Sequence, residues 1–247
     1  MRAYIFDVDG TLTPSRSTID PEFAEWFLDW TLAESLTLRS SVHLVTGSDY
    51  PKTVEQVGED IVNAIKRCYN CSGSSVWENG KEIFHNEFKI SEQQEDWLKA
   101  QLNNSRFHMR TGNHFEYRTG MLNFSIVGRN ADKEERKHYV AYDKRSRERH
   151  RIAEQFNKQF DDVQATVGGE TGLDIAQLGK DKSQILRDFD NEPVTFFGDR
   201  MEEGGNDYAL SEALWRRKMP DPFNRDRLYH VEDWKHTWNI LKSPINY

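Results

Sequence analysis

Two acidic residues stand directly after the first apolar run of the chain. Residues 3–9 read AYIFDVD, so Asp7 and Asp9 follow a short segment with the pattern of a buried parallel strand. A carboxylate at such a place is costly to remove from water unless a partner compensates its charge. Asp199 follows a second apolar run, and the loop after it contains Asp207. Because ligands bind at the carboxyl ends of parallel strands, these carboxylates are expected to converge in one crevice.

Phosphoryl transfer is the chemistry that fits such a cluster. Carboxylates that lie close together repel one another, and a Mg²⁺ ion held by one or two of them and by phosphate oxygens removes that repulsion. One carboxylate is then available as a nucleophile through an acyl phosphate, and a second, two residues on, can carry the proton. Lys182 and a hydroxyl of Thr46 or Ser48 can supply charge and hydrogen bonds to the transferring group.

Alternating strands and helices are expected to position these residues. Apolar residues at helical spacing predict helices over residues 21–36 and 50–65, and a third helix is expected over 180–189. Strands are expected at the start of SVHLVTGSD (41–49) and of PVTFFGD (193–199). This alternation predicts an α/β core around a parallel sheet with right-handed crossovers.

The middle of the chain has a different pattern. Residues 113–128 alternate with a period of two around a Thr-Gly turn, which predicts an antiparallel hairpin. Two helices are expected after it, one that starts with a capping box of Asp132 and Glu135 and one over 151–160. The predicted organisation is a catalytic core with an inserted α+β cap domain, the core being residues 1–76 and 180–247 and the cap 77–179.

Composition narrows the functional classes. The 247 residues include 36% hydrophobic and 30% charged residues, as in soluble globular proteins, and the net charge of −8 argues against nucleic acid or an anionic membrane as a partner. No apolar run approaches the roughly 20 residues of a membrane helix, and the N-terminus reads as a strand, so a cytoplasmic location is expected. Cys68 and Cys71 are given no metal role, because the sequence contains no second C-x-x-C or H-x-x-x-H pair that would complete a zinc site. The basic run 144–151 is interpreted as a solvated helical face.

Four segments, taken in order, resemble the motifs of the haloacid dehalogenase (HAD) superfamily of phosphotransferases. They are DVDGT, VTGSD, Lys182 and GDRMEEGGND. The resemblance implies that Asp7 is the nucleophile, that Asp9 is the general acid and base, and that Lys182 and either Thr46 or Ser48 bind phosphate. It also implies that Mg²⁺ is held by Asp7, Asp9, Asp199 and Asp207, with Asp9 contributing its main-chain carbonyl.

Longer segments are similar to the eukaryotic-type phosphomannomutase family over most of the chain. They are FDVDGTLTPSR, GSDY, EYRTGMLNFSIVGRNADKEER, GGETGLDIAQLGKDK and FFGDRMEEGGND. The resemblance implies a Rossmann-like HAD core with a C2b-like cap, and the interconversion of mannose 1-phosphate and mannose 6-phosphate through an aspartyl phosphate. It further implies a hexose 1,6-bisphosphate activator, a homodimer formed through the cap, and substrate contacts from Arg16, Arg118, Arg129, Arg136 and Asp174.

Two alternatives remain beside this interpretation. A sugar-phosphate phosphatase on the same scaffold is one, because the family usually carries a serine where this chain has Gly172. A non-catalytic binding protein is the other, although the intact acidic residues and Lys182 argue against it. Arginines suit the recognition of a distal phosphate, since a guanidinium donates two parallel hydrogen bonds and stays charged. The choice between mannose and glucose depends on hydroxyl contacts that the sequence does not predict.

Overall fold

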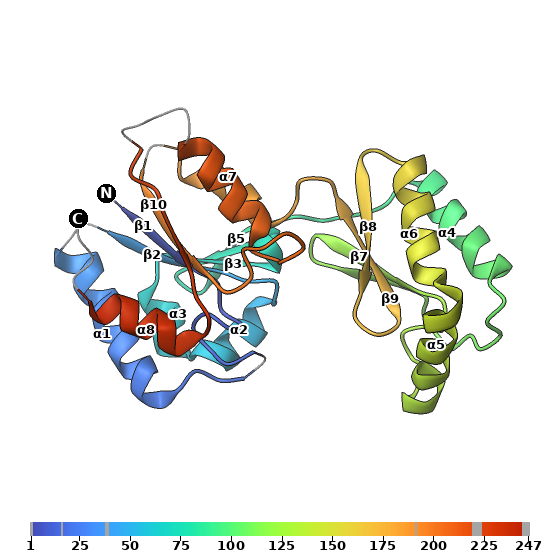
Figure 1. Cartoon of the computed structure of the whole chain (residues 1–247), viewed down its shortest axis with the longest axis horizontal. Helices are drawn as coiled ribbons and strands as arrows, with labels where there is room; N and C mark the ends of the chain where they lie inside the picture. The colour runs from blue at the N-terminus through green and yellow to red at the C-terminus, as the bar shows by residue number, and fades with distance from the viewer. Residues whose placement is uncertain (1, 16, 38–39, 191, 219–223, 244–247) are drawn as a thin grey trace. The chain divides into compact units, whose positions relative to one another are not determined.

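Contacts divide the chain into two units in the computed structural model, which describes residues 2–15, 17–37, 40–190, 192–218 and 224–243. The first unit is Met1–His85 with Gly179–Tyr247, and the second is Asn86–Leu178 (Figure 1). The first boundary lies later than the predicted position at residue 76. The reason is that β4 (Ser75–Glu78) and β5 (Lys81–His85) pair within the sheet of the first unit.

The first unit is built on a seven-stranded sheet of order β11-β10-β1-β2-β3-β4-β5. Strands β4 and β5 are antiparallel. The parallel strands are β1 (Ala3–Phe6), β2 (Ser41–Val45), β3 (Arg67–Asn70), β10 (Val194–Gly198) and β11 (Arg227–His230). Because β1 lies between β10 and β2, the loops that follow these three strands emerge side by side at one edge of the sheet.

Both faces of this sheet are covered by helices. One face packs against α1 (Pro21–Thr37), α2 (Tyr50–Val57), α3 (Glu59–Ala64) and α8 (Trp234–Lys242). The other packs against α7 (Tyr208–Lys218) and the 3₁₀ helix η2 (Lys182–Asp188). A second short 3₁₀ helix, η1 (Cys71–Gly73), follows β3.

The position of β1 in the middle of the covered sheet explains why its sequence is apolar throughout. Tyr4 and Phe6 belong to the core on one face, while Ala3 and Ile5 belong to the core on the other. A parallel strand buried on both faces has no polar side to alternate with. The next residue, Asp7, is therefore carried into the interior at the point where the strand ends.

Two predicted helices differ in detail. The helix expected over 50–65 is divided into α2 and α3 at Gly58, whose φ of 88° ends the first helix. The helix expected over 180–189 is the 3₁₀ helix η2, which begins at Lys182 after the side chain of Asp181 accepts the amide N–H of Ser183. In both cases the sequence located the segment, whereas the backbone form depended on local turns.

The second unit is a four-stranded antiparallel sheet of order β6-β7-β9-β8 with three helices. The predicted hairpin is confirmed as β6 and β7, and the predicted capping box of Asp132 and Glu135 opens α5. The elements are α4 (Glu92–Asn104), β6 (Phe115–Arg118), β7 (Met121–Ser125), α5 (Lys133–Ser146), α6 (Glu148–Gln159), β8 (Val163–Gly168) and β9 (Gly172–Gln177).

One face of this second sheet packs against helices, and the other face is polar. Leu122, Phe124, Leu173 and Ile175 point into a core shared with α4, α5 and α6. In Figure 1 the three helices lie on the same side of the sheet. The residues between these apolar positions, on β6, β7 and β9, face away from that core. This helix-free side is called the free face below.

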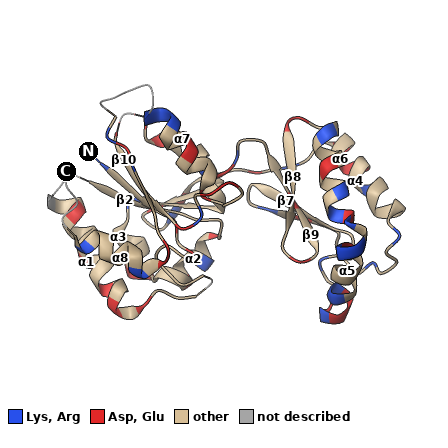
Figure 2. Cartoon of the chain, in the orientation of Figure 1, with Lys and Arg blue, Asp and Glu red and all other residues tan. Residues whose placement is uncertain are grey.

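The basic run 144–151 spans a break between two helices. Arg147 has a left-handed φ of 52° between α5 and α6, so the run does not form one continuous helical face. Arg149 turns back and pairs with the buried carboxylate of Asp143 at 2.8 Å. Figure 2 shows the remaining basic residues gathered along α5 and α6.

Among the described residues, no helix has both the length and the apolar character that a membrane span requires.

Candidate active site

A lysine and two carboxylates meet in the interior of the first unit. Asp7 follows β1, Lys182 opens η2, and Asp207 precedes α7, and their side chains are 1%, 1% and 0% exposed. The ammonium group of Lys182 binds Oδ1 of Asp7 and lies 2.7 Å from Oδ1 of Asp207. A buried charge is tolerated when it is paired and hydrogen-bonded, so these three residues depend on one another.

The electrostatics of this group follow from burial and pairing. Burial raises the pKa of Asp7, the positive charge of Lys182 opposes that rise, and the negative charge of Asp207 adds to it. Burial alone would lower the pKa of Lys182, but its two carboxylate partners raise it. Lys182 therefore stays protonated at neutral pH, and its positive charge works against the protonation of Asp7 that burial favours.

Asp199 completes a cluster that fits a divalent cation. Asp7, Asp199 and Asp207 each offer a carboxylate oxygen, and these oxygens lie within 4.8 Å of one another. Oδ2 of Asp7 and Oδ1 of Asp199 are buried, and neither has a hydrogen-bond partner among the described residues. Burial and the neighbouring Asp207 raise the pKa of Asp199. Buried anionic oxygens without donors are the ligands that Mg²⁺ accepts, so the residues present fit the ion.

A glycine makes room for one of these carboxylates. A Cβ atom on Gly10 would lie 2.2 Å from Oδ2 of Asp199, and the φ of Gly10 is +83°. Both the space and the backbone conformation therefore exclude a side chain at this position. The Gly of the DVDGT motif thus lets the loop after β1 approach Asp199 closely.

Asp9 is held apart from the carboxylate cluster. Its side chain is partly exposed, and Oδ1 accepts a hydrogen bond from Nε2 of Gln56 at 2.9 Å. Gln56 lies in α2 and is only 1% exposed. Gln56 is not among the predicted site residues, because a glutamine near the end of a helix belongs to no motif. Its contact with Asp9 arises only when α2 packs beside β1.

Thr46 and Ser48 lie together in the loop after β2. Thr46 is buried, and its hydroxyl oxygen accepts the amide N–H of Ser48 at 3.1 Å. The carbonyl of Thr46 accepts the amide N–H of Ser72, so this residue ties the loop to the neighbouring segment. Ser48 is partly exposed. The two hydroxyls are thus in different environments, one engaged and enclosed, the other nearer to solvent.

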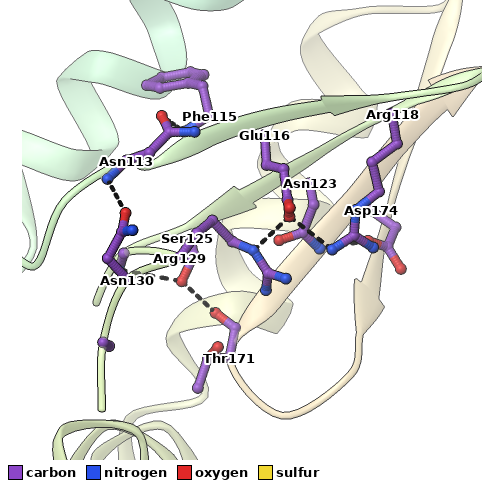
Figure 3. Close-up of polar contacts among 12 residues, drawn as sticks. Asn113, Phe115, Glu116, Arg118, Asn123, Ser125, Arg129, Asn130, Thr171 and Asp174 are labelled. Atoms are coloured by element: carbon purple, nitrogen blue, oxygen red, sulfur yellow. Dashed lines mark hydrogen bonds and ion pairs between the residues drawn. The ribbon is translucent and has the colours of Figure 1, made fainter.

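In the second unit, two of the predicted arginines converge on a glutamate of the free face (Figure 3). Oε2 of Glu116 accepts hydrogen bonds from Nη2 of Arg118 and from Nε of Arg129, each at 2.6 Å. Burial alone would raise the pKa of Glu116, but the two guanidinium groups outweigh it and lower that pKa. Arg136 does not join this group, since it donates to the main-chain carbonyls of Ala131 and Arg129.

Asp174 faces the same side from β9. Its Oδ1 accepts a hydrogen bond from Nδ2 of Asn123 at 2.6 Å (Figure 3). Glu116 and Asn123 were not among the predicted residues, although both occupy polar positions of the period-two pattern in the hairpin. That alternation could have shown which face they occupy, but not their partners. Arg16, predicted as a substrate contact, lies outside the described residues.

Similar solved structures show the fold class. A trehalose-6-phosphate phosphatase of Aspergillus fumigatus is 16% identical with a TM-score of 0.60, over 97% of this chain and 91% of that chain. A haloacid dehalogenase-like hydrolase of Bacteroides thetaiotaomicron is 12% identical with a TM-score of 0.57, over 98% of each chain. The predicted Rossmann-like HAD core with an inserted cap is confirmed at the level of the fold.

Sequence relatives are more specific. The family described as eukaryotic phosphomannomutase matches residues 30–215. The phosphomannomutase of Saccharomyces cerevisiae is 33% identical over 217 residues, which cover 83% of this chain and 83% of that protein. Those of Arabidopsis thaliana and Drosophila melanogaster are 33% identical over 221 residues (85% of this chain and 86% of that protein) and 32% identical over 219 (83% and 84%). The chain therefore belongs to the eukaryotic phosphomannomutase family.

Proposed function

We propose that the protein is a Mg²⁺-dependent phosphomannomutase that interconverts mannose 1-phosphate and mannose 6-phosphate through a phosphoaspartate. Within the structure, the proposal is carried by the buried group of Asp7, Lys182 and Asp207 beside Asp199. A chain that needed only stability would gain from apolar residues at these positions, because buried ion pairs rarely repay their desolvation. Retention of all four charged residues favours a chemical role.

Asp7 is the proposed nucleophile. Its Oδ1 is bound by Lys182, and its Oδ2 has no partner among the described residues, so one oxygen is anchored and the other is available. The charge of Lys182 favours the ionised carboxylate that attack on phosphorus requires. Asp7 and Asp199 would hold Mg²⁺ through their unpartnered oxygens. When bound, the ion would neutralise charge on the transferring phosphoryl group.

Asp207 holds Lys182 and the loop that contains Asp199 in place. Its Oδ1 binds Lys182, and its Oδ2 accepts the amide N–H of Arg200 at 3.2 Å. With both oxygens engaged, Asp207 anchors the ammonium group and the loop that carries Asp199. We assign it to the magnesium site as a supporting acid.

Asp9 is the proposed general acid and base. Its partial exposure lets it exchange a proton with a substrate oxygen, and the bond from Gln56 orients its carboxyl group. For phosphate binding we favour Ser48 over Thr46, because the Thr46 hydroxyl already accepts a main-chain N–H. Lys182 is assigned to both phosphate binding and catalysis.

Residues of the second unit are proposed to bind the hexose phosphate. Arg118 and Arg129 each give Glu116 one N–H group and keep others for a phosphate. Arg136 braces the segment that carries Arg129, and Asp174 is proposed to accept hexose hydroxyls. From the family resemblance we also propose Arg16 as a substrate contact, hexose 1,6-bisphosphate as the activator, a homodimer formed through the second unit and a cytoplasmic location.

Product analysis tests this function. The protein is incubated with mannose 1-phosphate, Mg²⁺ and a trace of glucose 1,6-bisphosphate, and the products are separated. Mannose 6-phosphate is the expected product. Free phosphate without mannose 6-phosphate would identify a sugar-phosphate phosphatase, and no reaction at all would favour a binding protein.

A further inference from the structure

Polar residues form a straight row across the free face of the second unit. Glu116 on β6 pairs in register with Asn123 on β7, and Asn123 pairs with Asp174 on β9. Figure 3 shows the three side chains on the same face, with the amide of Asn123 beside the carboxylate of Asp174. Asn123 thus lies between the residue that gathers two arginines and the residue proposed to contact the hexose.

The side chain of Asn123 is buried and only half satisfied. Asn123 is 4% exposed, and its Nδ2 donates to Asp174 at 2.6 Å. Its Oδ1 is buried without a partner among the described residues. A buried amide oxygen that lacks a donor destabilises a fold, so an apolar side chain of the same size would serve stability at least as well. The amide is therefore better explained by what its N–H group does to Asp174.

Two glycines shape the space for this pair. A Cβ on Gly172 would lie 2.5 Å from Nδ2 of Asn123, and a Cβ on Gly168 would lie 2.0 Å from Oδ2 of Asp174. Gly168 and Gly172 are themselves paired in register between β8 and β9. Neither has a positive φ, so the backbone does not require glycine at either place. Glycine weakens a strand, and here it gives the two side chains their clearance.

The geometry points to Asn123 as a positioning residue. It holds the carboxylate of Asp174 in the orientation that accepts a hydrogen bond from a hexose hydroxyl, and Gly168 and Gly172 leave the space that the two side chains occupy. One N–H group of the amide holds Oδ1 of Asp174, which leaves Oδ2 to accept a hydrogen bond from the sugar. Among the described residues, Oδ2 has no hydrogen-bond partner of its own. The inference rests on the proposed function, in which Asp174 contacts the hexose.

Kinetics of three variants test the inference. Asn123→Ala removes the N–H donor, and Gly172→Ala places a methyl group where the amide lies. Each is expected to raise the KM for mannose 1-phosphate about tenfold, because a hydrogen bond to a charged group is lost or displaced. The kcat for a small aryl phosphate, which has no sugar to position, is expected to stay unchanged. The matched control is Gln164→Ala, which removes an exposed amide from the same face and should alter neither constant.

The double variant separates positioning from a general effect on folding. With Asn123 replaced by alanine, the amide that a methyl group at residue 172 would strike is gone. Adding Gly172→Ala to Asn123→Ala should therefore raise the KM by little more than the single change. Additive effects in this cycle would overturn the inference, and so would an unchanged KM in Asn123→Ala. Equal losses with the aryl phosphate would assign Asn123 to the fold instead.

The activity of the wild-type protein distinguishes a failure of this inference from a failure of the proposed function on which it rests. If the wild type forms no mannose 6-phosphate from mannose 1-phosphate, the proposed function fails before any variant is compared. If the wild type is active and Asn123→Ala keeps its KM, only the positioning role fails. Thermal unfolding of each variant confirms that the comparison is made between folded proteins.

Discussion

Removal of Lys182 is expected to destabilise the metal-free protein strongly and in a pH-dependent way. The ammonium group is 1% exposed and contacts two carboxylates that are themselves buried. Lys182→Met keeps the length of the side chain and removes its charge. Breaking a buried ion pair by deleting one partner costs about 3 to 5 kcal/mol, and we expect a loss of unfolding free energy in that range.

The sign of the pH dependence follows from the direction of the pKa shifts. Burial raises the pKa of Asp7 in the folded state, so its contribution to stability is present at low pH and is lost as the pH rises through the folded pKa. Without Lys182, the main group that opposes that rise is gone, so Asp7 in the folded protein keeps its proton to higher pH. The destabilisation by Lys182→Met is therefore expected to be smaller at pH 5 than at pH 8.

Urea unfolding followed by tryptophan fluorescence measures this effect. Every tryptophan except Trp97 lies in the first unit, so the signal reports mainly on the unit that contains Lys182. Lys52→Met is the control, since Lys52 forms an exposed pair with Glu55 and such pairs contribute about 0 to 1 kcal/mol. Equal unfolding free energies for Lys182→Met and wild type, at both pH values, would refute the reasoning.

Four further substitutions examine single contacts of the proposed site. Gln56→Leu should lower kcat about tenfold with little change in KM, because Asp9 loses the donor that orients it; a KM effect alone would contradict this. Ser48→Ala is expected to reduce the turnover of every phosphate substrate at unchanged thermal stability. Thr46→Ala should lower thermal stability, because the buried hydroxyl that accepts the amide N–H of Ser48 is lost; the reverse pattern would exchange the two assignments. Arg118→Ala should raise the KM for hexose phosphates and spare a small aryl phosphate, and equal losses on both would place Arg118 outside substrate recognition.

Much of the first unit could be predicted, because its strands and their acidic ends are visible in short stretches of the sequence. The residues of β1 are apolar on both faces, and the residue after the strand is acidic, which together indicate a buried parallel strand with a functional end. The same signals after β10 placed Asp199 at the same edge of the sheet. The boundary between the contact units lies after His85 and not at residue 76, because the short strands β4 and β5 join the first sheet by the pairing of β4 with β3 and of β5 with β4.

The contacts of the second unit depended on tertiary geometry. The alternation in residues 113–128 predicts a hairpin, but it does not reveal that Glu116 accepts hydrogen bonds from both Arg118 and Arg129. In the same way, Asn123 meets Asp174 only after β7 and β9, far apart in the sequence, become neighbours. Gly172 looked in the sequence like a missing hydroxyl, whereas the structure shows that the space is filled by the amide of Asn123.

Chemical trapping of the phosphorylated enzyme tests the central claim most directly. The protein is mixed with Mg²⁺ and glucose 1,6-bisphosphate and quenched with borohydride, which reduces an aspartyl phosphate to homoserine. Peptide mass spectrometry is then expected to find homoserine at residue 7, and Asp7→Asn should show neither homoserine nor turnover. Homoserine at another residue, or turnover of hexose phosphate by Asp7→Asn at the wild-type rate, would contradict the assignment of Asp7 as the nucleophile.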